Sequence, residues 1–306
     1  MTLPVSILLV MKNELANMRV IMPIVRRQLY SAPVEVVYID SGSTDGTVEY
    51  MADLGIAAHR IAPHEFHHGR TRNLAAGMAR HEILVLLSGD AVPTTETWLA
   101  NLVAPFEDAR VGAVYGRQIA PDHLAALRRQ SLASEYPAMR QVRDLVNTEK
   151  VHPGLFRFSN VNAAIRRDVW ARFLWNETLT LAEDQGMCRD ILMAGMKVVY
   201  EPEAAVIHGH DRTLWGEFKF AADNGISLTR LGILNNPQIT GEFGYGLSRV
   251  KTDVGHFLGK RQYGYAAMSA AVAGAKWCGV QLGKRERYLP DWLLRRVSEV
   301  YEKTRG

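Results

Sequence analysis

Residues suited to acid–base, phosphate or metal chemistry lie directly after short apolar stretches of the chain. Three such stretches, at residues 5–10, 34–39 and 83–87, are followed by Asn13 and Glu14, by Asp40 and Ser41, and by Ser88, Gly89 and Asp90. The stretches are rich in branched side chains and nearly continuous, as expected for strands buried on both faces of a parallel sheet. Because ligands bind beyond the carboxyl ends of such strands, these polar residues predict a binding site there.

Asp40 opens the sequence Asp-Ser-Gly-Ser-Thr-Asp-Gly-Thr, which ends at Thr47. A carboxylate at the end of a strand can accept hydrogen bonds from a ring N–H or a ribose hydroxyl. The same stretch also suits a glycine turn and the N-cap of a helix, so its residues alone leave both interpretations open. The chain has no Gly-x-Gly-x-x-Gly after a strand and no P-loop motif, which argues against a nicotinamide enzyme and a P-loop NTPase.

The elements that must position these residues alternate between strand and helix as far as about residue 210. Further apolar stretches lie at 111–115 and 198–200, and helical patterns lie at about 14–29, 46–54, 70–80 and 95–108. This alternation predicts an α/β fold with a mainly parallel central sheet. Later in the chain only helices are expected, at 213–232, 245–259, 263–282 and 290–304. We therefore expect an α/β domain over residues 1–212 and a helical extension over residues 213–306.

Charge is distributed unevenly along the chain. Its 306 residues are 47% hydrophobic and 22% charged, an ordinary globular composition that excludes disorder, collagen and coiled coil. Residues 1–248 carry a net charge of −3, whereas residues 249–306 carry 12 Lys and Arg against 5 Asp and Glu, a net charge of +7. The basic segment suits an anionic partner, and the lack of a nucleic-acid-binding motif favours a membrane surface over nucleic acid. A solvated basic face is the alternative.

The compartment is predicted from the first residues and the cysteines. Residues 1–10 have no basic region and no small-residue cleavage site, so we expect no secretory signal. The apolar stretch at 263–275 predicts a packed or interfacial helix rather than a membrane span. Cys188 and Cys278 show no spacing typical of a zinc site or a disulfide framework. We expect a cytoplasmic protein; peripheral contact with the inner face of the membrane and helix packing in a homodimer stay open for the basic extension.

The order of the motifs resembles the inverting family 2 glycosyltransferases of the GT-A fold, over roughly residues 3–215. The matching motifs, in order, are Asn13-Glu14; Asp40 to Thr47; Gly-Arg-Thr-Arg-Asn at 69–73; Ser-Gly-Asp-Ala at 88–91; Glu183-Asp184; and a histidine after a late strand. The resemblance implies a nucleotide-sugar-binding GT-A catalytic domain at residues 1–212. It also implies a transfer reaction that expels a nucleoside diphosphate.

The resemblance further implies a divalent cation, Mg²⁺ or Mn²⁺, beside the leaving diphosphate. Asp90 stands at the third place of the family's Asp-x-Asp triplet, but Ser88 stands at the first, so a single carboxylate remains. His208 resembles the histidine that completes the family's metal site. His210, two residues later, is a second candidate ligand.

Glu183 and Asp184 match the family's catalytic acidic pair. The resemblance makes Asp184 the general base for the acceptor hydroxyl, with Glu183 orienting it or contacting the acceptor. By themselves, the two residues could equally be acids that complement a helix dipole. The donor-binding residues implied by the resemblance are Asn13, Glu14, Asp40, Ser41, Arg70, Arg72, Asn73, Ser88, Gly89, Asp90, Asn160 and Asn162.

Local features are similar to the rhamnosyltransferase branch of the family. They are the sequences from Glu65 to Asn73, from Asp90 to Pro93 and from His208 to Phe218. They imply L-rhamnose from dTDP-rhamnose as the donor sugar, with a UDP- or GDP-sugar as the alternative. The acceptor implied is a glycan or a lipid-linked glycan in bacterial surface polysaccharide synthesis.

Two other functions are weighed against this one. A sugar-nucleotide pyrophosphorylase would have a Gly-rich phosphate loop with Thr-Arg after the first strand, where this chain has Met11-Lys-Asn-Glu14. A non-catalytic sugar-nucleotide-binding scaffold of the same fold is favoured by the single carboxylate of the triplet. The acidic pair Glu183-Asp184 and His208 argue against the scaffold.

Overall fold

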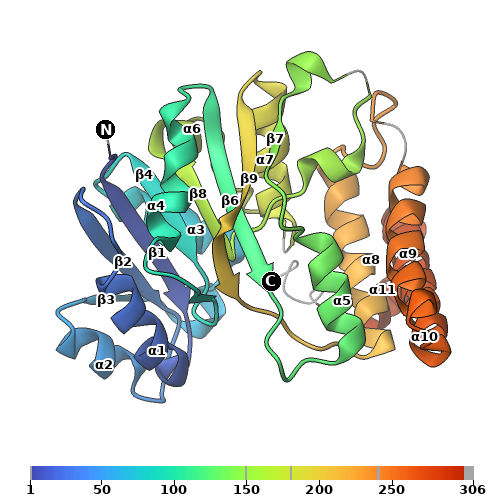
Figure 1. The fold of residues 1–306 in the computed structure, drawn as a ribbon, viewed down its shortest axis with the longest axis horizontal. Coiled ribbons are helices and arrows are strands. Elements are labelled where there is room, and N and C mark those ends of the chain that lie inside the picture. Colours follow the sequence, from blue (N-terminus) through green and yellow to red (C-terminus); the bar gives the residue numbers. More distant parts are fainter. Residues whose placement is uncertain (1, 149, 180, 240–241, 300–306) are drawn as a thin grey trace.

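The computed structural model describes residues 2–148, 150–179, 181–239 and 242–299 (Figure 1). The strands are β1 (Val5–Met11), β2 (Val34–Asp40), β3 (Ala58–Arg60), β4 (Ile83–Leu87), β5 (Val92–Pro93), β6 (Val111–Ile119), β7 (Gln141–Arg143), β8 (Asn162–Arg166) and β9 (Lys197–Ile207). The helices are α1 (Leu15–Arg26), α2 (Thr47–Asp53), α3 (His68–Met78), α4 (Trp98–Val103), α5 (Ala126–Glu135), α6 (Arg167–Phe173), α7 (Glu183–Met193), α8 (Leu214–Arg230), α9 (Glu242–Gly259), α10 (Tyr263–Gly283) and α11 (Asp291–Val297). Short 3-10 turns lie at Pro63–Glu65, Ala104–Glu107, Leu145–Asn147, Pro153–Phe156 and Glu286–Tyr288.

The strands form a mixed sheet with the order β3-β2-β1-β4-β8-β6-β9-β5, and β7 pairs with β9. Strands β3, β2, β1 and β4 run parallel, β8 runs antiparallel between β4 and β6, and β9 is parallel to β6. The predicted α/β fold and the five predicted strands are confirmed. The sheet is mixed because β8, which the sequence analysis did not assign to a strand, lies between two strands of the opposite direction.

The central strands are buried on both faces, which explains their nearly continuous apolar sequences. In β1, Ile7 and Leu9 belong to a core that includes Met18 of α1 and Trp98 of α4. Leu8 faces the other way, into a core that includes side chains of α3 and α7. In Figure 1, α1 and α4 accordingly lie in front of the sheet and α3 behind it.

The carboxyl ends of β1 and β2 are tied together at one edge of the sheet. Met11 pairs with Asp40 at the end of their ladder, and the N–H of Ser41 donates to the carbonyl oxygen of Met11 at 3.2 Å. Asn13, with φ 58°, accepts a hydrogen bond from the N–H of Thr44 at 2.8 Å. These bonds fix the two loops against each other, so the polar residues that follow the strands share one edge as predicted.

Helices α8 to α11 form the C-terminal part of the chain, at the right of Figure 1. The last predicted helix was placed at 290–304, whereas α11 ends at Val297 and residues 300–304 lie outside the described ranges. Helix α10 packs closely against α8 at Gly279, where an added Cβ atom would lie only 2.4 Å from the carbonyl oxygen of Phe218.

In the described ranges, no helix combines the length and the apolar character needed to cross a membrane. The domain boundary at residue 212 stays a prediction.

Strands β6 and β9 change register beside the expected site, between Gly116 and Gln118. A Cβ atom at Gly116 would lie 2.0 Å from the carbonyl oxygen of Ala204 and 2.2 Å from Nδ2 of Asn162. Only a glycine therefore lets this part of β9 close onto β6. The closure carries the end of β9, and with it His208, to the edge where β1 and β4 end.

Replacing Gly116 should test this close approach. We expect Gly116→Ala to lower the free energy of unfolding by about 1–3 kcal/mol, because the added methyl group overpacks the β6–β9 contact. Urea unfolding followed by circular dichroism measures the change. Gly77→Ala in α3 is the matched control, because nothing lies within 4 Å of a Cβ atom there. The control should be neutral or stabilising by up to about 1 kcal/mol. Equal stability of Gly116→Ala and the wild type would contradict the close packing.

Candidate active site

A cavity of about 410 Å³ opens at the carboxyl ends of β1 and β4. Its walls come from the loops after β1, β2 and β4, from the segment before α3 and from α3 itself: Val10, Met11, Lys12, Glu14, Ser41, Pro63, Phe66, His68, Arg72, Ser88, Gly89 and Asp90. Six of the residues that the sequence analysis assigned to the donor are in this set: Glu14, Ser41, Arg72, Ser88, Gly89 and Asp90. The volume is in the range of small-molecule sites. We refer to it as the donor cavity, after the predicted role of these six residues.

A carboxylate and two imidazoles meet beside the donor cavity. Nε2 of His210 lies 2.8 Å from Oδ2 of Asp90, and Nε2 of His208 lies 3.5 Å from the same oxygen. One ligand atom from each residue lies within 4.8 Å of the others. Burial acts to raise the pKa of Asp90, but the interactions with the neighbouring His208 and His210 outweigh it and lower that pKa. An ionised carboxylate with two imidazole nitrogens is a donor set that fits a divalent cation.

Asp40 organises the loop after β2 and does not line the cavity. Its fully buried carboxylate accepts hydrogen bonds from the N–H of Gly42 at 3.0 Å, the N–H of Ser43 at 3.2 Å and the hydroxyl of Tyr38 at 3.0 Å. Burial acts to raise the pKa of Asp40, but the hydrogen bonds from Ser43, Gly42 and Tyr38 outweigh it and lower that pKa. The structure therefore favours the turn-forming interpretation of this motif.

Arg72 of α3 and Glu183 of α7 form an ion pair in which both side chains are largely buried, at 17% and 7% exposed. Nη1 of Arg72 donates to Oε1 of Glu183, and Nδ2 of Asn160 donates to the same oxygen at 3.3 Å. The backbone N–H of Asn160 donates to Oδ2 of Asp184 at 3.4 Å. The structure thus brings together four residues that are far apart in the sequence: Arg72, Asn160, Glu183 and Asp184.

The carboxyl group of Asp184 has an unusual environment at the start of α7. Burial and the neighbouring charge of Glu183 raise the pKa of Asp184 to about 7, although the charge of Arg72 opposes them. A group with a pKa near neutrality can both take up and release a proton at physiological pH, which suits a general base. Ala182, which precedes the helix, has φ 61° and so turns the chain sharply into α7.

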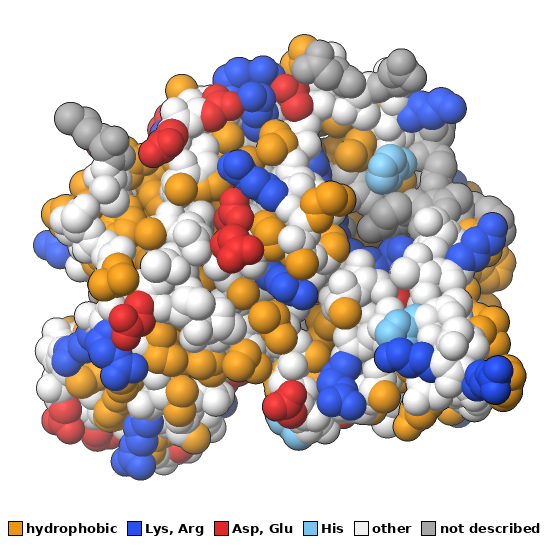
Figure 2. Space-filling view, viewed as in Figure 1, with side chains coloured by type: hydrophobic (Ala, Val, Ile, Leu, Met, Phe, Trp, Pro, Cys, Tyr) orange, Lys and Arg blue, Asp and Glu red, His pale blue; other side chains and the backbone are white. Residues whose placement is uncertain are grey.

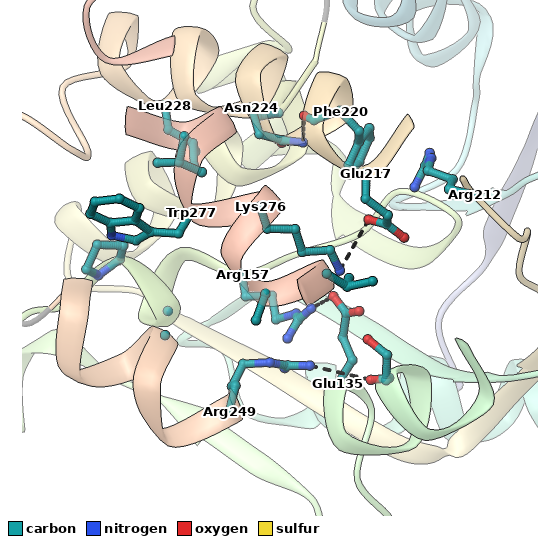
Figure 3. Close-up of a pocket in the computed structure, with 18 of the residues that line it drawn as sticks. Glu135, Arg157, Arg212, Glu217, Phe220, Asn224, Leu228, Arg249, Lys276 and Trp277 are labelled. Carbon is teal, nitrogen blue, oxygen red and sulfur yellow. Dashed lines mark hydrogen bonds and ion pairs between the residues drawn. The ribbon is translucent and has the colours of Figure 1, made fainter. Parts of the chain in front are cut away.

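A larger cavity of about 1070 Å³ has Asp184 in its wall, and we refer to it as the large cavity. Helices α5, α8, α9 and α10 supply much of its wall. Figure 3 shows Lys276 of α10 pointing to Glu217 of α8, with Nζ 3.3 Å from Oε2, and Arg157 paired with Glu135 of α5. The wall is also strongly apolar, with Leu127, Phe220, Leu228, Leu234, Leu247, Val250, Val272, Trp277 and Val280 among its residues.

The two cavities share part of their walls. His68 and Arg72 line both of them. Asp90 lines the donor cavity, whereas Glu183 and Asp184 line the large cavity. A molecule bound in one cavity would therefore meet a molecule bound in the other beside Arg72. Asp90, whose pKa is lowered, would lie on one side of this junction, and Asp184, whose pKa is raised, would lie on the other.

Six residues that were assigned to the donor do not line either cavity: Asn13, Asp40, Arg70, Asn73, Asn160 and Asn162. Asn162 is fully buried in β8 and supports the core instead. Its Oδ1 accepts a hydrogen bond from Nε1 of Trp98 at 2.9 Å, and its Nδ2 donates to the carbonyl oxygen of Ala204 at 2.7 Å. Both polar ends of this amide are used within the protein, which leaves none for a donor sugar.

Asn73 and Arg70 also hold the architecture together. Oδ1 of Asn73 accepts from Nε1 of Trp170 in α6 and from the N–H of Trp175, both at 3.0 Å, so α3 is fastened to α6 and to the segment that follows it. Nη2 of Arg70 donates to the carbonyl oxygen of Glu65 at 2.6 Å on the exposed side of α3. Of the two arginines of the motif, only Arg72 reaches the cavities.

Sequence reasoning missed several residues of the site. Phe66 and Pro63 line the donor cavity, and the Phe-His-His-Gly sequence was noticed only as a family feature. Gln118 lies 2.9 Å from His208, but no sequence signal marks a glutamine in a strand as part of a site. The cavity-lining residues of α8 to α10, such as Lys276 and Trp277, follow only from how these helices fold back toward Asp184.

Comparison with known proteins agrees with this geometry. The family model described as "Glycosyl transferase family 2" matches residues 6–173. The O-antigen chain rhamnosyltransferase RfbN of Salmonella typhimurium is 32% identical over 265 residues, which is 84% of this chain and 82% of that protein. The O-antigen chain rhamnosyltransferase WbaN of Salmonella anatum is 31% identical over 264 residues, with the same shares of both chains.

A solved structure shares the fold. The mannosyltransferase PcManGT from Pyrobaculum calidifontis, in complex with GDP-Man and Mn²⁺, superimposes with a TM-score of 0.57 at 20% identity. The match covers 99% of this chain and 85% of that one. At this identity the likeness shows the fold, which is the GT-A fold of glycosyltransferases. With the family model over more than half of the chain and two relatives above 30% identity, the chain belongs to glycosyl transferase family 2.

Proposed function

We propose that this glycosyltransferase is an inverting enzyme that moves L-rhamnose from dTDP-rhamnose to a hydroxyl of a glycan or lipid-linked glycan. The observation that carries the reaction type is the junction of two cavities at Arg72 and His68, with Asp90 on one side and Asp184 on the other. The choice of rhamnose is supported by the two O-antigen chain rhamnosyltransferases at 32% and 31% identity.

In this proposal Asp184 is the general base. Its carboxylate accepts the proton of the acceptor hydroxyl as that oxygen attacks the anomeric carbon of the donor. The bond from the anomeric carbon to the diphosphate breaks at the same time, and the nucleoside diphosphate leaves with the electron pair, so the configuration at carbon inverts. The raised pKa of Asp184 supports this assignment, because a carboxylate with a higher pKa is a stronger base toward the acceptor hydroxyl.

Arg72 and Glu183 position the base and the leaving group. The guanidinium of Arg72 borders both cavities, so its positive charge faces the diphosphate as negative charge develops there. Glu183 is held by Arg72 and by Asn160, and its negative charge keeps the pKa of the neighbouring Asp184 raised. These two residues therefore serve orientation and electrostatics rather than proton transfer.

Asp90, His208 and His210 are proposed to hold the divalent cation. When bound, the cation neutralises the charge that the diphosphate gains on leaving. Imidazole nitrogens are more usual ligands of transition metals than of Mg²⁺, which prefers oxygen ligands, so we expect Mn²⁺ to bind more tightly than Mg²⁺. Ser88 stands where the family's triplet has its first carboxylate. In this proposal, the Nε2 atoms of His208 and His210 beside Asp90 replace that missing ligand.

The large cavity is proposed to bind the acceptor. It begins at Asp184, where the acceptor hydroxyl must lie, and its volume of about 1070 Å³ exceeds what one sugar unit needs. Its apolar wall from α8 to α10 suits a lipid portion, while Lys276 and Arg157 suit anionic or polar groups near the sugar. This combination supports a lipid-linked glycan over a free monosaccharide.

Calorimetric titration with dTDP, UDP and GDP, each with and without Mn²⁺, tests the donor and the metal together. We expect dTDP to bind most tightly and to need Mn²⁺. Asp90→Asn should weaken dTDP binding in Mn²⁺ by at least roughly tenfold, because outer-shell partners of metal ligands alone are worth about 10–100-fold. Asp108→Asn is the control, since that carboxylate pairs with Lys197 outside both cavities.

Other outcomes of this titration would revise the proposal in different ways. A preference for UDP or GDP would replace rhamnose by another sugar and leave the reaction type standing. Tight binding that ignores Mn²⁺ and is unaffected by Asp90→Asn would contradict the metal site. No binding of any of the three nucleotides would contradict the assignment of the donor cavity.

We further propose that the C-terminal helices contact an anionic membrane surface. Residues 249–306 carry a net charge of +7, and Figure 2 shows basic side chains over the helices at the right of the view, where acidic ones are scarce. Tyr288 and Trp292 are exposed at 70% and 66%, and aromatic side chains among basic ones suit the interface of a bilayer. The homodimer named in the sequence analysis stays a prediction.

Vesicle co-sedimentation tests the membrane proposal. We expect binding to vesicles that contain phosphatidylglycerol, no binding to pure phosphatidylcholine, and weaker binding at 0.5 M than at 0.1 M salt because charge is screened. Trp292→Ser should reduce binding several-fold. Leu29→Ser, which removes a similarly exposed apolar side chain beyond α1, is the control and should bind as the wild type does. Equal sedimentation with both kinds of vesicle would contradict the proposal.

A further inference from the structure

We propose that Gln118 is a positioning residue that turns the Nε2 atom of His208 toward the divalent cation. This inference rests on the proposed metal site and goes beyond it, because Gln118 does not belong to the ligand set. Nδ1 of His208 lies 2.9 Å from Oε1 of Gln118, while Nε2 of the same ring faces Asp90 at 3.5 Å. The two ring nitrogens therefore have different partners.

The partner of Nδ1 fixes the tautomer of the ring. An amide oxygen only accepts hydrogen bonds, so the Nδ1 atom of His208 must carry a hydrogen to make this contact. A neutral imidazole with hydrogen on Nδ1 has its lone pair on Nε2, the atom that faces Asp90. Metal-bound histidines in proteins are commonly held in this way by a hydrogen bond from the other ring nitrogen.

The amide of Gln118 has hydrogen-bond partners at both of its ends. Its Nε2 lies 2.8 Å from the hydroxyl oxygen of Tyr136 and 2.9 Å from Oγ of Ser159. In this orientation both hydrogens of the NH₂ group have a hydroxyl oxygen as acceptor, and the oxygen end faces His208. Gln118 and Tyr136 are both buried, so water has little access to replace either contact.

The backbone brings Gln118 to this position through the register change between β6 and β9. After the change, Gln118 pairs with Val206, and the N–H of His208 donates to the carbonyl oxygen of Ile119 at 2.9 Å. Without the change, a different residue of β6 would lie beside the end of β9. The register change at Gly116 therefore places both His208 and Gln118, the side chain proposed to orient it.

The same network reaches the segment that holds the general base. Ser159, which accepts from Gln118, precedes Asn160, whose N–H donates to Asp184. The positions of the metal ligand and of the base are thereby set by one short piece of chain between the 3-10 turn at Pro153–Phe156 and β8.

Two variants separate positioning from simple core packing. Gln118→Met keeps the length of the side chain and removes both polar ends. Gln118→Glu keeps an acceptor for Nδ1–H, because the hydroxyls of Tyr136 and Ser159 can turn and donate to a carboxylate. Gln28→Met is the matched control: Gln28 also makes several hydrogen bonds, to the backbone of Ile24, Thr95 and Leu99.

The first readout is the affinity for Mn²⁺ alone, measured by electron paramagnetic resonance titration of the full chain. We expect Gln118→Met to bind Mn²⁺ about 10–100-fold more weakly than the wild type. Gln118→Glu should bind within a few-fold of the wild type, and so should Gln28→Met. If Gln118→Met fails to fold, the tautomer of His208 in the wild type carries the test, and the Nε2–H form there would overturn the inference.

The second readout is the tautomer of His208 in metal-free protein, from long-range ¹H–¹⁵N correlation spectra. We expect the Nδ1–H form in the wild type and in Gln118→Glu, and the Nε2–H form, which free imidazole side chains favour, in Gln118→Met. Wild-type Mn²⁺ affinity and an unchanged tautomer in Gln118→Met would overturn the inference, as would a tenfold loss of affinity in Gln118→Glu. If the wild type binds no Mn²⁺, the proposed metal site falls and this inference falls with it.

Discussion

The ion pair between Arg72 and Glu183 joins the two halves of the site. It links α3, which packs beside β1 and β2, to α7, which packs on the opposite end of the sheet. Both side chains are largely buried, so removing either one would leave an unpaired charge at a cost of about 3–5 kcal/mol. The donor cavity and the large cavity meet at this pair. In the proposed reaction, the distance between the bound donor and Asp184 depends on this pair.

The turn before α7 completes this arrangement. Ala182 has φ 61°, a conformation that costs a non-glycine residue about 1–3 kcal/mol and persists only where the surroundings enforce it. It lets Glu183 point to Arg72 while Asp184 receives the N–H of Asn160. The raised pKa of Asp184 is thus a consequence of the fold, because burial and the neighbouring Glu183 cause it.

The sequence predicted the elements whose pattern is strong and local. Strands such as β4 are continuous apolar runs between polar turns, so their existence follows from composition. Strands β3, β5 and β7 have two or three residues, too few for a pattern. The segment that forms β8 was interpreted as donor-binding because it contains Asn162, and no strand was assigned there. Gln118 shows the limit most clearly, since its role depends on a register change that Gly116 permits across two strands.

The proposed function depends on Asp184 acting as the base beside an intact donor cavity. The most direct measurement compares Asp184→Asn with the wild type in two assays: turnover of dTDP-rhamnose with a bacterial membrane lipid extract as acceptor source, and calorimetric dTDP affinity in Mn²⁺. We expect a fall in turnover on the order of 10²–10⁴-fold, with dTDP affinity changed no more than a few-fold, because the base acts on the acceptor. Wild-type turnover by Asp184→Asn would contradict the role of Asp184 as the base.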